Sequence, residues 1–324
     1  MRAYKITVSK AGDPTAILAS YSTFNADGSY NPNALKVELD CPVYAYGDPA
    51  GAASVKIYGV DFSQIRAPSN FNDMDIMISG GMSKGLPLAN PAQFGVLLQG
   101  TIFQAFGNWQ GGESSLQFFV YAKKGTHADP VNLSYTWKAG ETLQDMVTQV
   151  LRIAYPGCTV SGGFASSLVY TEDQPLSYTT MADFAQRVLQ ISRVINPDPN
   201  YHGAQIRPSP SGFVLYDDTT RPAAKELSPL DLIGQPTWLN PGQLQVRTVM
   251  RADIQTDDVL KLPVGSNVIN VPSTSNVTRD RNALGFQGEF SVVSVRHLGN
   301  SRQNGAESWM TVFDCTAPPA STSP

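Results

Sequence analysis

The chain has little charge and no long apolar run. Charged residues make up 15% of its 324 residues, whereas about a quarter is usual for a globular domain. The net charge is −4, and the longest purely basic run is Lys123-Lys124, which argues against a nucleic-acid-binding protein with a basic patch. No apolar run approaches the ~18 residues of a membrane helix. The N-terminus alternates like a strand and does not resemble a signal peptide, so we expect cytoplasmic synthesis without export by a signal in this chain.

Cysteine is scarce, with only Cys41, Cys158 and Cys315. The three residues are far apart, odd in number and never in a CxxC pattern. A disulfide framework and a zinc site are therefore both disfavoured. We predict buried, inert thiols.

Residues in catalytic or metal-binding patterns are also lacking. The sequence contains no GxSxG, HExxH or phosphate-loop motif. Its histidines are isolated from one another: His127, His202 and His297. Its acidic pairs fall at predicted turns and strand ends, where solvated Asx-turns are the usual structure: Asp73/Asp75, Asp217/Asp218 and Asp257/Asp258. We predict no enzymatic activity, no cofactor and no metal site.

The chain is rich in residues that make strands and turns, with 27 glycines, 23 prolines, 13 tyrosines and 14 phenylalanines. Residues 1–128 are predicted to form an N-terminal β domain. Its strands are expected at 4–8, 35–39, 53–60, 73–79, 94–106 and 116–122, with a bend at Gly100. Residues 80–88 are predicted to be an irregular loop, and 107–112 a turn. We expect Trp109 to lie in the core.

The middle of the chain changes to helical periodicity. Apolar residues recur at helical spacing over 142–154 and again over 180–195. Thr142 and Asp145 form the pattern of a capping box at the start of the first helix. Strands are expected at 167–170 and 212–217. The prediction is a small α/β domain over residues 129–235.

The last third is predicted to be β again, over residues 236–316. Residues 286–297 alternate with period two, a polar run covers 299–308, and a second apolar run follows at 309–315. This is the pattern of a hairpin with a long solvated loop. Trp309 is expected in the core. Residues 317–324, rich in Pro, Ser and Thr, are predicted to be a disordered tail.

One short string allows a second interpretation. Residues 135–143, Tyr-Thr-Trp-Lys-Ala-Gly-Glu-Thr-Leu, resemble the opening of a LysM module, which would imply binding to peptidoglycan. Such a module is short and keeps its two helices close together, whereas here the second helix begins only near Thr180. A capped core helix explains the same string.

Three stretches in order resemble baseplate hub proteins of contractile-tailed bacteriophages, of the Mu or myovirus type. They are 81–95 with 100–111, 137–143 with 178–184, and 288–297 with 308–315. The resemblance implies a mainly β fold with an α/β insert, in which two tail-tube-like β-barrel domains flank a small middle domain with two helices. That agrees with the β–insert–β order read from periodicity.

The resemblance also implies a function. Such hubs are homotrimers whose ring adapts the hexameric tail tube to the central spike. The implied partners are the spike, the tail tube or distal tube protein, the tape-measure protein and baseplate wedge components. Sequence-specific nucleic-acid recognition and membrane contact are not implied. The implied location is the tail baseplate of the virion, after synthesis in the host bacterial cytoplasm.

Two polar loops are the candidate contacts between subunits in this reading. The residues chosen are Lys84, Leu86, Pro87, Leu88, Asn300, Arg302 and Gln303. The alternative function is that of a peptidoglycan-binding (LysM-like) or wall-processing tail protein.

Overall fold

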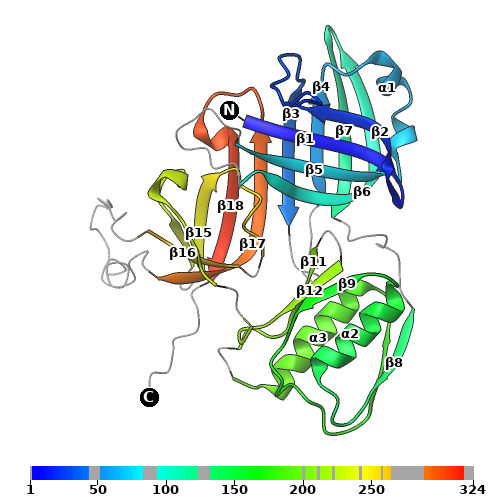
Figure 1. The fold of residues 1–324 in the computed structure, drawn as a ribbon, viewed down its shortest axis with the longest axis vertical. Helices are drawn as coiled ribbons and strands as arrows, with labels where there is room; N and C mark the ends of the chain where they lie inside the picture. Colours follow the sequence, from blue (N-terminus) through cyan, green and yellow to red (C-terminus); the bar gives the residue numbers. More distant parts are fainter. Residues whose placement is uncertain are drawn as a thin grey trace.

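The computed structural model is mainly β (Figure 1). Its described residues form three hydrophobic cores. It describes residues 2–43, 52–82, 93–122, 132–198, 201–209, 212–220, 223–240, 243–256, 258–263 and 288–316. One core lies in the N-terminal region, one in the middle region and one in the C-terminal region. The β–insert–β order expected from periodicity is present.

Seven strands make up the N-terminal region: β1 (Arg2–Lys10), β2 (Asp13–Ser22), β3 (Lys36–Val43), β4 (Ala53–Tyr58), β5 (Asp75–Met82), β6 (Gly95–Gln110) and β7 (Glu113–Ala122). A short helix α1 (Phe62–Arg66) and a 3-10 turn η1 (Pro68–Phe71) connect β4 to β5. The six predicted strands correspond to β1 and β3–β7. Strand β2 was not predicted, because its charged and exposed first half hides the period-two pattern.

Parts of two segments predicted to be irregular, 80–88 and 107–112, are strand, and residues 83–88 lie outside the described residues. Gly80, Gly81 and Met82 continue β5, and residues 107–110 continue β6 to a turn at Gly111 and Gly112. Close packing accounts for the glycine pair in β5. A Cβ on Gly80 would lie 2.7 Å from Leu97 Cδ1, and one on Gly81 would lie 2.7 Å from Phe94 Cα. The glycines therefore permit close approach and do not interrupt the strand.

The middle region, called the middle domain below, contains helices and short strands around its own hydrophobic core. Helix α2 (Leu143–Ala154) begins at the N-cap Thr142, whose hydroxyl accepts from Asp145 N–H, and helix α3 (Met181–Ile195) begins at the N-cap Thr180, whose hydroxyl accepts from Asp183 N–H. Both helices match the prediction.

Short strands surround these helices: β8 (Leu133–Trp137), β9 (Thr159–Gly162), β10 (Gln174–Tyr178), β11 (Gln205–Ser209) and β12 (Gly212–Tyr216). They form two small sheets, β10–β8 and β11–β12–β9. The predicted strand at 167–170 is wrong, since only a single bridge joins Val169 to Thr142.

The C-terminal region contributes the strands β13 (Lys225–Glu226), β14 (Thr237–Asn240), β15 (Gln243–Val249), β16 (Val259–Lys261), β17 (Glu289–Asn300) and β18 (Trp309–Thr316), with the 3-10 turns η3 (Pro229–Asp231) and η4 (Ala306–Ser308). The long hairpin expected from the sequence is β17–β18. The tail at 317–324 lies outside the described residues.

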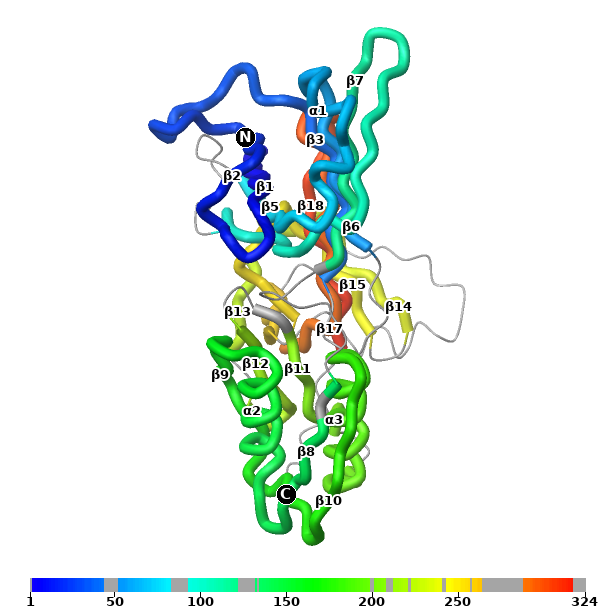
Figure 2. Tube along the Cα trace, turned by 90° about the vertical axis from the view of Figure 1, so that its right-hand side faces the viewer, coloured from blue at the N-terminus to red at the C-terminus, as the bar shows by residue number. Residues whose placement is uncertain are grey.

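The N- and C-terminal regions share one sheet of 13 strands, in the order β14-β15-β18-β17-β3-β4-β7-β6-β5-β1-β2, with β16 beside β17 and β13 beside β16. Strand β17 makes the connection. It pairs with β18 along one edge, and along its other edge it pairs first with β16 and then, from Val295 to Asn300, with β3. Figure 2 shows β7, β3, β17 and β15 following one another down one side of the molecule.

Apolar packing crosses the same junction. Trp309, on β18, is 2% exposed and belongs to the N-terminal core together with Met250. Its indole N–H donates to the Gly81 carbonyl at 2.9 Å. Val43 packs against both the N-terminal and the C-terminal core. The two β regions are therefore joined by interior contacts as well as by backbone hydrogen bonds.

Trp309, Cys41 and Cys315 are buried as predicted, whereas Cys158 is only half-buried and Trp109 is exposed. Cys41 and Cys315 are buried free thiols, and burial raises the pKa of each above the ordinary thiol value. Trp109 is 62% exposed, because β6 continues as a hairpin beyond the core, and its ring stands edge-on to Phe62 of α1 at 5.1 Å.

Replacing Gly100 by Ala tests whether glycine is needed for the close approach of β6 and β7. The added Cβ would lie 2.2 Å from the Tyr121 carbonyl oxygen, so one strand must shift. We expect the free energy of unfolding to fall by at least about 1–3 kcal/mol in urea titrations. Gly112→Ala is the control, because its Cβ meets nothing within 4 Å. Equal stabilities for the two variants would contradict this packing.

Because of His297, we predict that the stability of the fold decreases at acidic pH. The imidazole is fully buried, its Nδ1 lies 2.9 Å from the Thr311 hydroxyl, and its Nε2 has no hydrogen-bond partner in the part of the chain that the structure describes. Burial lowers the pKa of His297 from 6.5 to about 3. Between these values the unfolded chain binds a proton that the folded chain does not, so stability decreases as the pH falls.

The group should contribute up to about 1.4 kcal/mol per pH unit across that window. Urea unfolding at pH 7, 6 and 5 should show a steeper loss for the parent chain than for His297→Asn, whose amide does not titrate. Parallel pH profiles for the two proteins would refute the assignment.

Candidate assembly surfaces

One face of the shared sheet carries the residues that alternate, along each strand, with the buried core residues. On β4, β3 and β17 the buried side chains include Val55, Leu39 and Val295. Their neighbours along each strand point to the opposite side, and register extends this side across β7, β6, β18 and β15. We call this side the outer face.

Charges in the middle of the outer face are paired. Arg296 donates two hydrogen bonds to the Asp40 carboxylate, at 2.8 and 2.6 Å, and Lys36 lies 2.8 Å from Glu38. Asp314 accepts from Gln245 and Ser294. Exposed pairs of this kind stabilise a fold by only about 0–1 kcal/mol. Their main consequence is a surface without a field of one sign.

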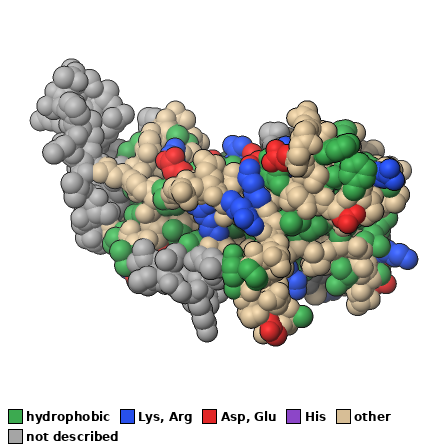
Figure 3. All heavy atoms as spheres, turned by 90° about the horizontal axis from the view of Figure 1, so that it is seen from above, with side chains coloured by type: hydrophobic (Ala, Val, Ile, Leu, Met, Phe, Trp, Pro, Cys, Tyr) green, Lys and Arg blue, Asp and Glu red, His purple; other side chains and the backbone are tan. Residues whose placement is uncertain are grey.

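The view from above shows a mixed surface as well. Lys and Arg side chains gather near the middle of the molecule in this view, with Asp and Glu side chains beside some of them (Figure 3). Among the described residues seen from above, the basic side chains do not form one continuous surface.

An aromatic strip occupies the β6–β7 end of the outer face. It consists of Phe103, Phe106, Phe119 and Tyr121. Phe103 stacks on Tyr121 with ring centroids 4.1 Å apart, and Phe106 stands edge-on to Phe119 at 5.9 Å. Phe106 is 46% exposed and Tyr121 52%. Contiguous exposed aromatic area of this kind is typical of a surface that binds another protein.

The β17–β18 hairpin loop is braced by its own chain. The Arg2 guanidinium donates to the carbonyls of Asn300, Gln303 and Gly305. At the start of the loop, Ser301 N–H donates to the Val37 carbonyl at 2.8 Å. The loop therefore has a fixed position against the N-terminal region.

The sequence-derived contact candidates fall into two groups. Lys84, Leu86, Pro87 and Leu88 lie outside the described residues. The other three lie in or beside the hairpin loop: Asn300, Arg302 and Gln303.

The hairpin-loop candidates differ in how far their side chains are engaged. The Asn300 amide donates to Glu38 Oε1 at 2.9 Å, and the Arg302 guanidinium donates to the Ala34 carbonyl at 2.5 Å. The Gln303 side chain is exposed and has no hydrogen bond to any residue that the structure describes. Contact with another subunit stays a prediction for all seven candidates.

His202, Asp217 and Asp218, which were weighed for chemistry, make structural contacts, whereas His127 and Asp257 lie outside the described residues. His202 Nδ1 lies 3.1 Å from Asp218 Oδ1. Asp217 is buried and accepts from Ala165 N–H and from Thr219. Over the ranges that the structure describes, no group of three His, Cys, Asp or Glu residues is placed to hold a metal ion. No helix within these ranges has the length and apolarity needed to span a bilayer.

The string that resembles a LysM opening forms the end of β8, a turn and the start of α2. Trp137 is fully buried and donates its indole N–H to the Glu141 carbonyl at 2.9 Å. Strand β10 lies between α2 and α3 in the chain and pairs antiparallel with β8. Trp137 therefore serves the core of the middle domain.

Comparison with known proteins is informative only at the level of structure. No family model matches the sequence, and no curated protein matches it significantly. The tail protein of Neisseria meningitidis MC58 superposes with a TM-score of 0.51 at 10% identity, covering 97% of this chain and 96% of that one. The 43 kDa tail protein of prophage MuSo2 from Shewanella oneidensis gives a TM-score of 0.53 at 7% identity, covering 98% and 99%.

These matches extend over nearly the full length of both partners, through the β–insert–β order. The chain has the fold of these phage tail proteins. The resemblance to tail hubs found in the sequence is thus supported by structure neighbours that are phage tail proteins.

Two substitutions distinguish the contacts that hold the hairpin loop in place from a contact that the loop makes with another subunit. Arg2→Gln removes the guanidinium that holds three loop carbonyls, and we expect a loss of about 1–2 kcal/mol in the free energy of unfolding. Gln303→Ala should leave that value within about 0.5 kcal/mol of the parent, as for other exposed positions.

Light scattering then tests the predicted contact. If Gln303 touches a neighbouring subunit, Gln303→Ala weakens self-association at unchanged stability. Unaltered association would remove Gln303 from the candidate contacts.

Proposed function

We propose that this protein is a structural hub of a contractile phage tail. In this role three copies form a ring that adapts the hexameric tail tube to the central spike. The full-length likeness to two phage tail proteins carries the proposal. The sequence resemblance to baseplate hubs points to the same role.

The shared sheet supports the tube-like part of the proposal. A tube lumen needs a continuous β surface along its wall, and the outer face provides one across strands of both β regions. We propose that the two β regions act as two tail-tube-like barrels, so that three subunits contribute six. Paired charges on the outer face suit a channel through which DNA passes without binding, because phosphate binding requires unpaired cations.

The aromatic strip is the proposed contact between subunits. Phe106 and Tyr121 expose large apolar area at the β6–β7 end of the outer face. Burial of this apolar area in a ring interface would stabilise the assembly by roughly 25 cal/mol for each Å² removed from water. Closed symmetry would bury the same patch on every copy.

The proposed partners follow from the proposed position in the tail. They are the central spike, the tail tube or distal tube protein, the tape-measure protein and baseplate wedge components. We propose a role without enzymatic activity, located in the virion tail.

A pair of aromatic substitutions tests the ring. Phe106→Ser with Tyr121→Ser should weaken self-association at least about tenfold, because aromatic anchors dominate interface energetics. The thermal midpoint should stay close to that of the parent, since both side chains are exposed. Light scattering over a concentration series measures both proteins.

Ile153→Ser with Val194→Ser is the matched control. These residues are exposed apolar side chains, 61% and 72% exposed, on helices of the middle domain, and the change should leave association unaltered. A parent chain that stays monomeric at every concentration, also with the spike partner present, would contradict the hub proposal. Binding to purified sacculi above that of a control protein would favour the peptidoglycan-binding alternative.

A further inference from the structure

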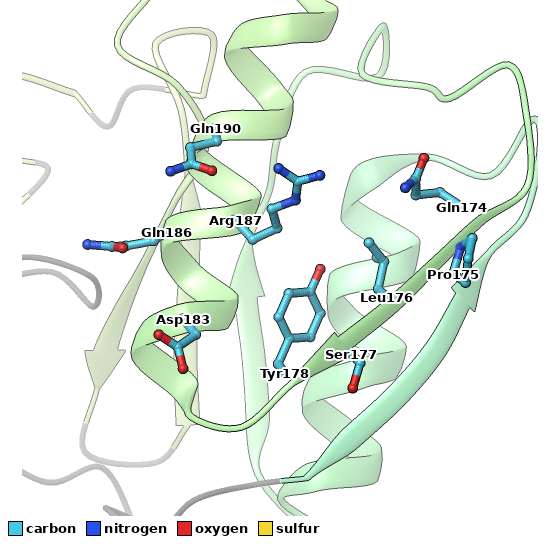
Figure 4. A pocket seen from close by; sticks show the side chains of 9 residues that line it. All are labelled: Gln174, Pro175, Leu176, Ser177, Tyr178, Asp183, Gln186, Arg187 and Gln190. Carbon is cyan, nitrogen blue, oxygen red and sulfur yellow. The ribbon is translucent and has the colours of Figure 1, made fainter.

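A groove in the middle domain lies between strand β10 and helix α3 (Figure 4). Its volume is about 350 Å³. Five consecutive residues of β10, Gln174–Tyr178, line one side, and the other side is lined by Asp183, Gln186, Arg187 and Gln190 of α3. Because successive strand residues point to opposite faces, a groove that touches all five runs along the edge of β10.

That edge of β10 is not paired within the described chain. β10 pairs with β8 alone, from Gln174 opposite Trp137 to Tyr178 opposite Leu133. Pro175 and Ser177 are exposed. A strand with one open edge presents backbone groups to which another extended segment can hydrogen-bond.

Tyr178 aims a buried, unsatisfied hydroxyl into the groove. The residue is 7% exposed, and its hydroxyl has no hydrogen-bond partner among the described residues. Its ring packs edge-on against Phe184 at 4.9 Å, which fixes its direction. Burial raises the pKa of Tyr178 to about 12, so the phenol remains a neutral donor. A buried polar group left without a partner is costly, and in a native protein it calls for an explanation such as a ligand.

Arg187 points into the same space from α3 (Figure 4). It forms no ion pair with any described residue, and its charge reaches the Tyr178 hydroxyl, where it opposes the effect of burial on the pKa. The one carboxylate that lines the groove, Asp183, is already bonded to Thr179 and Thr180. The groove therefore contains a cation and a phenol O–H donor, and no described residue supplies an acceptor that binds both.

We propose that this groove binds an extended, acidic segment of another protein. The segment would add to the open edge of β10 and place an Asp or Glu carboxylate between Arg187 and Tyr178. A carboxylate accepts hydrogen bonds from both donors, and charge-assisted bonds are the stronger kind. Pro175 has no N–H to donate, so few backbone bonds form and the acidic side chain is required for selectivity. This inference is independent of the hub proposal.

The test starts from a random hexapeptide library selected on the full-length chain. Selected peptides, synthesised with a fluorescent label, should carry Asp or Glu at one shared position. Fluorescence anisotropy should show binding at least about tenfold weaker for Arg187→Gln and a smaller loss for Tyr178→Phe. Arg152→Gln is the matched control, because it removes an equal charge from an exposed position on α2.

Two further arms separate the ligand classes. N-methylation of alternate peptide amides should abolish binding if the peptide adds as a strand. Peptides without a shared acidic position, or binding indifferent to Arg187→Gln, would overturn the proposal. Displacement of the peptide by an N-acetylglucosamine tetramer that itself binds more tightly would assign the groove to a glycan instead.

Discussion

The pairing of β17 with β3 is the contact on which the rest of the architecture depends. Six residues of β17, Val295–Asn300, pair with residues 38–43 of β3, from which they are 252 to 262 residues away in sequence, and so join the two β regions. Without this pairing the two cores would be separate, and the outer face would be interrupted. Gly299 permits the contact, because a Cβ there would lie 2.6 Å from the Trp309 ring and 2.8 Å from Leu39 Cγ. The long-range closure is thus specified by side-chain packing as well as by backbone hydrogen bonds.

The junction explains why buried polar groups collect there. Arg251 is 5% exposed and donates two hydrogen bonds to Asp253, at 2.8 and 2.6 Å. Its own backbone N–H donates to Thr311, the residue that also contacts His297. A charge buried here is tolerated only because it is paired, and loss of one partner would leave the other uncompensated. These four residues all belong to the C-terminal region, so the network stabilises that side of the junction.

Local periodicity in the sequence predicted most of the elements but not how they are joined. Both long helices followed from apolar spacing, and the N-cap of the first followed from Thr142 and Asp145. The pairing of β17 with β3 did not, because strand partners far apart in sequence leave no local signal. Trp109 was wrongly predicted to be buried for a related reason. A tryptophan suggests a core position, and only the length of the β6–β7 hairpin places this one outside the core. The aromatic strip was hidden likewise, since Phe106 and Tyr121 look like core residues until register assigns their side.

The middle domain is not joined to the other regions through the shared sheet. It contributes no strand to the shared sheet and has its own core around Trp137, Phe184 and Phe213. A domain that is not needed for the continuity of the sheet can keep a strand edge open without weakening the joined β regions. The unsatisfied Tyr178 hydroxyl lies in an open groove, whereas the unsatisfied Nε2 of His297 lies in a closed core. Both cost stability, but only the group in the groove is placed where a ligand can satisfy it.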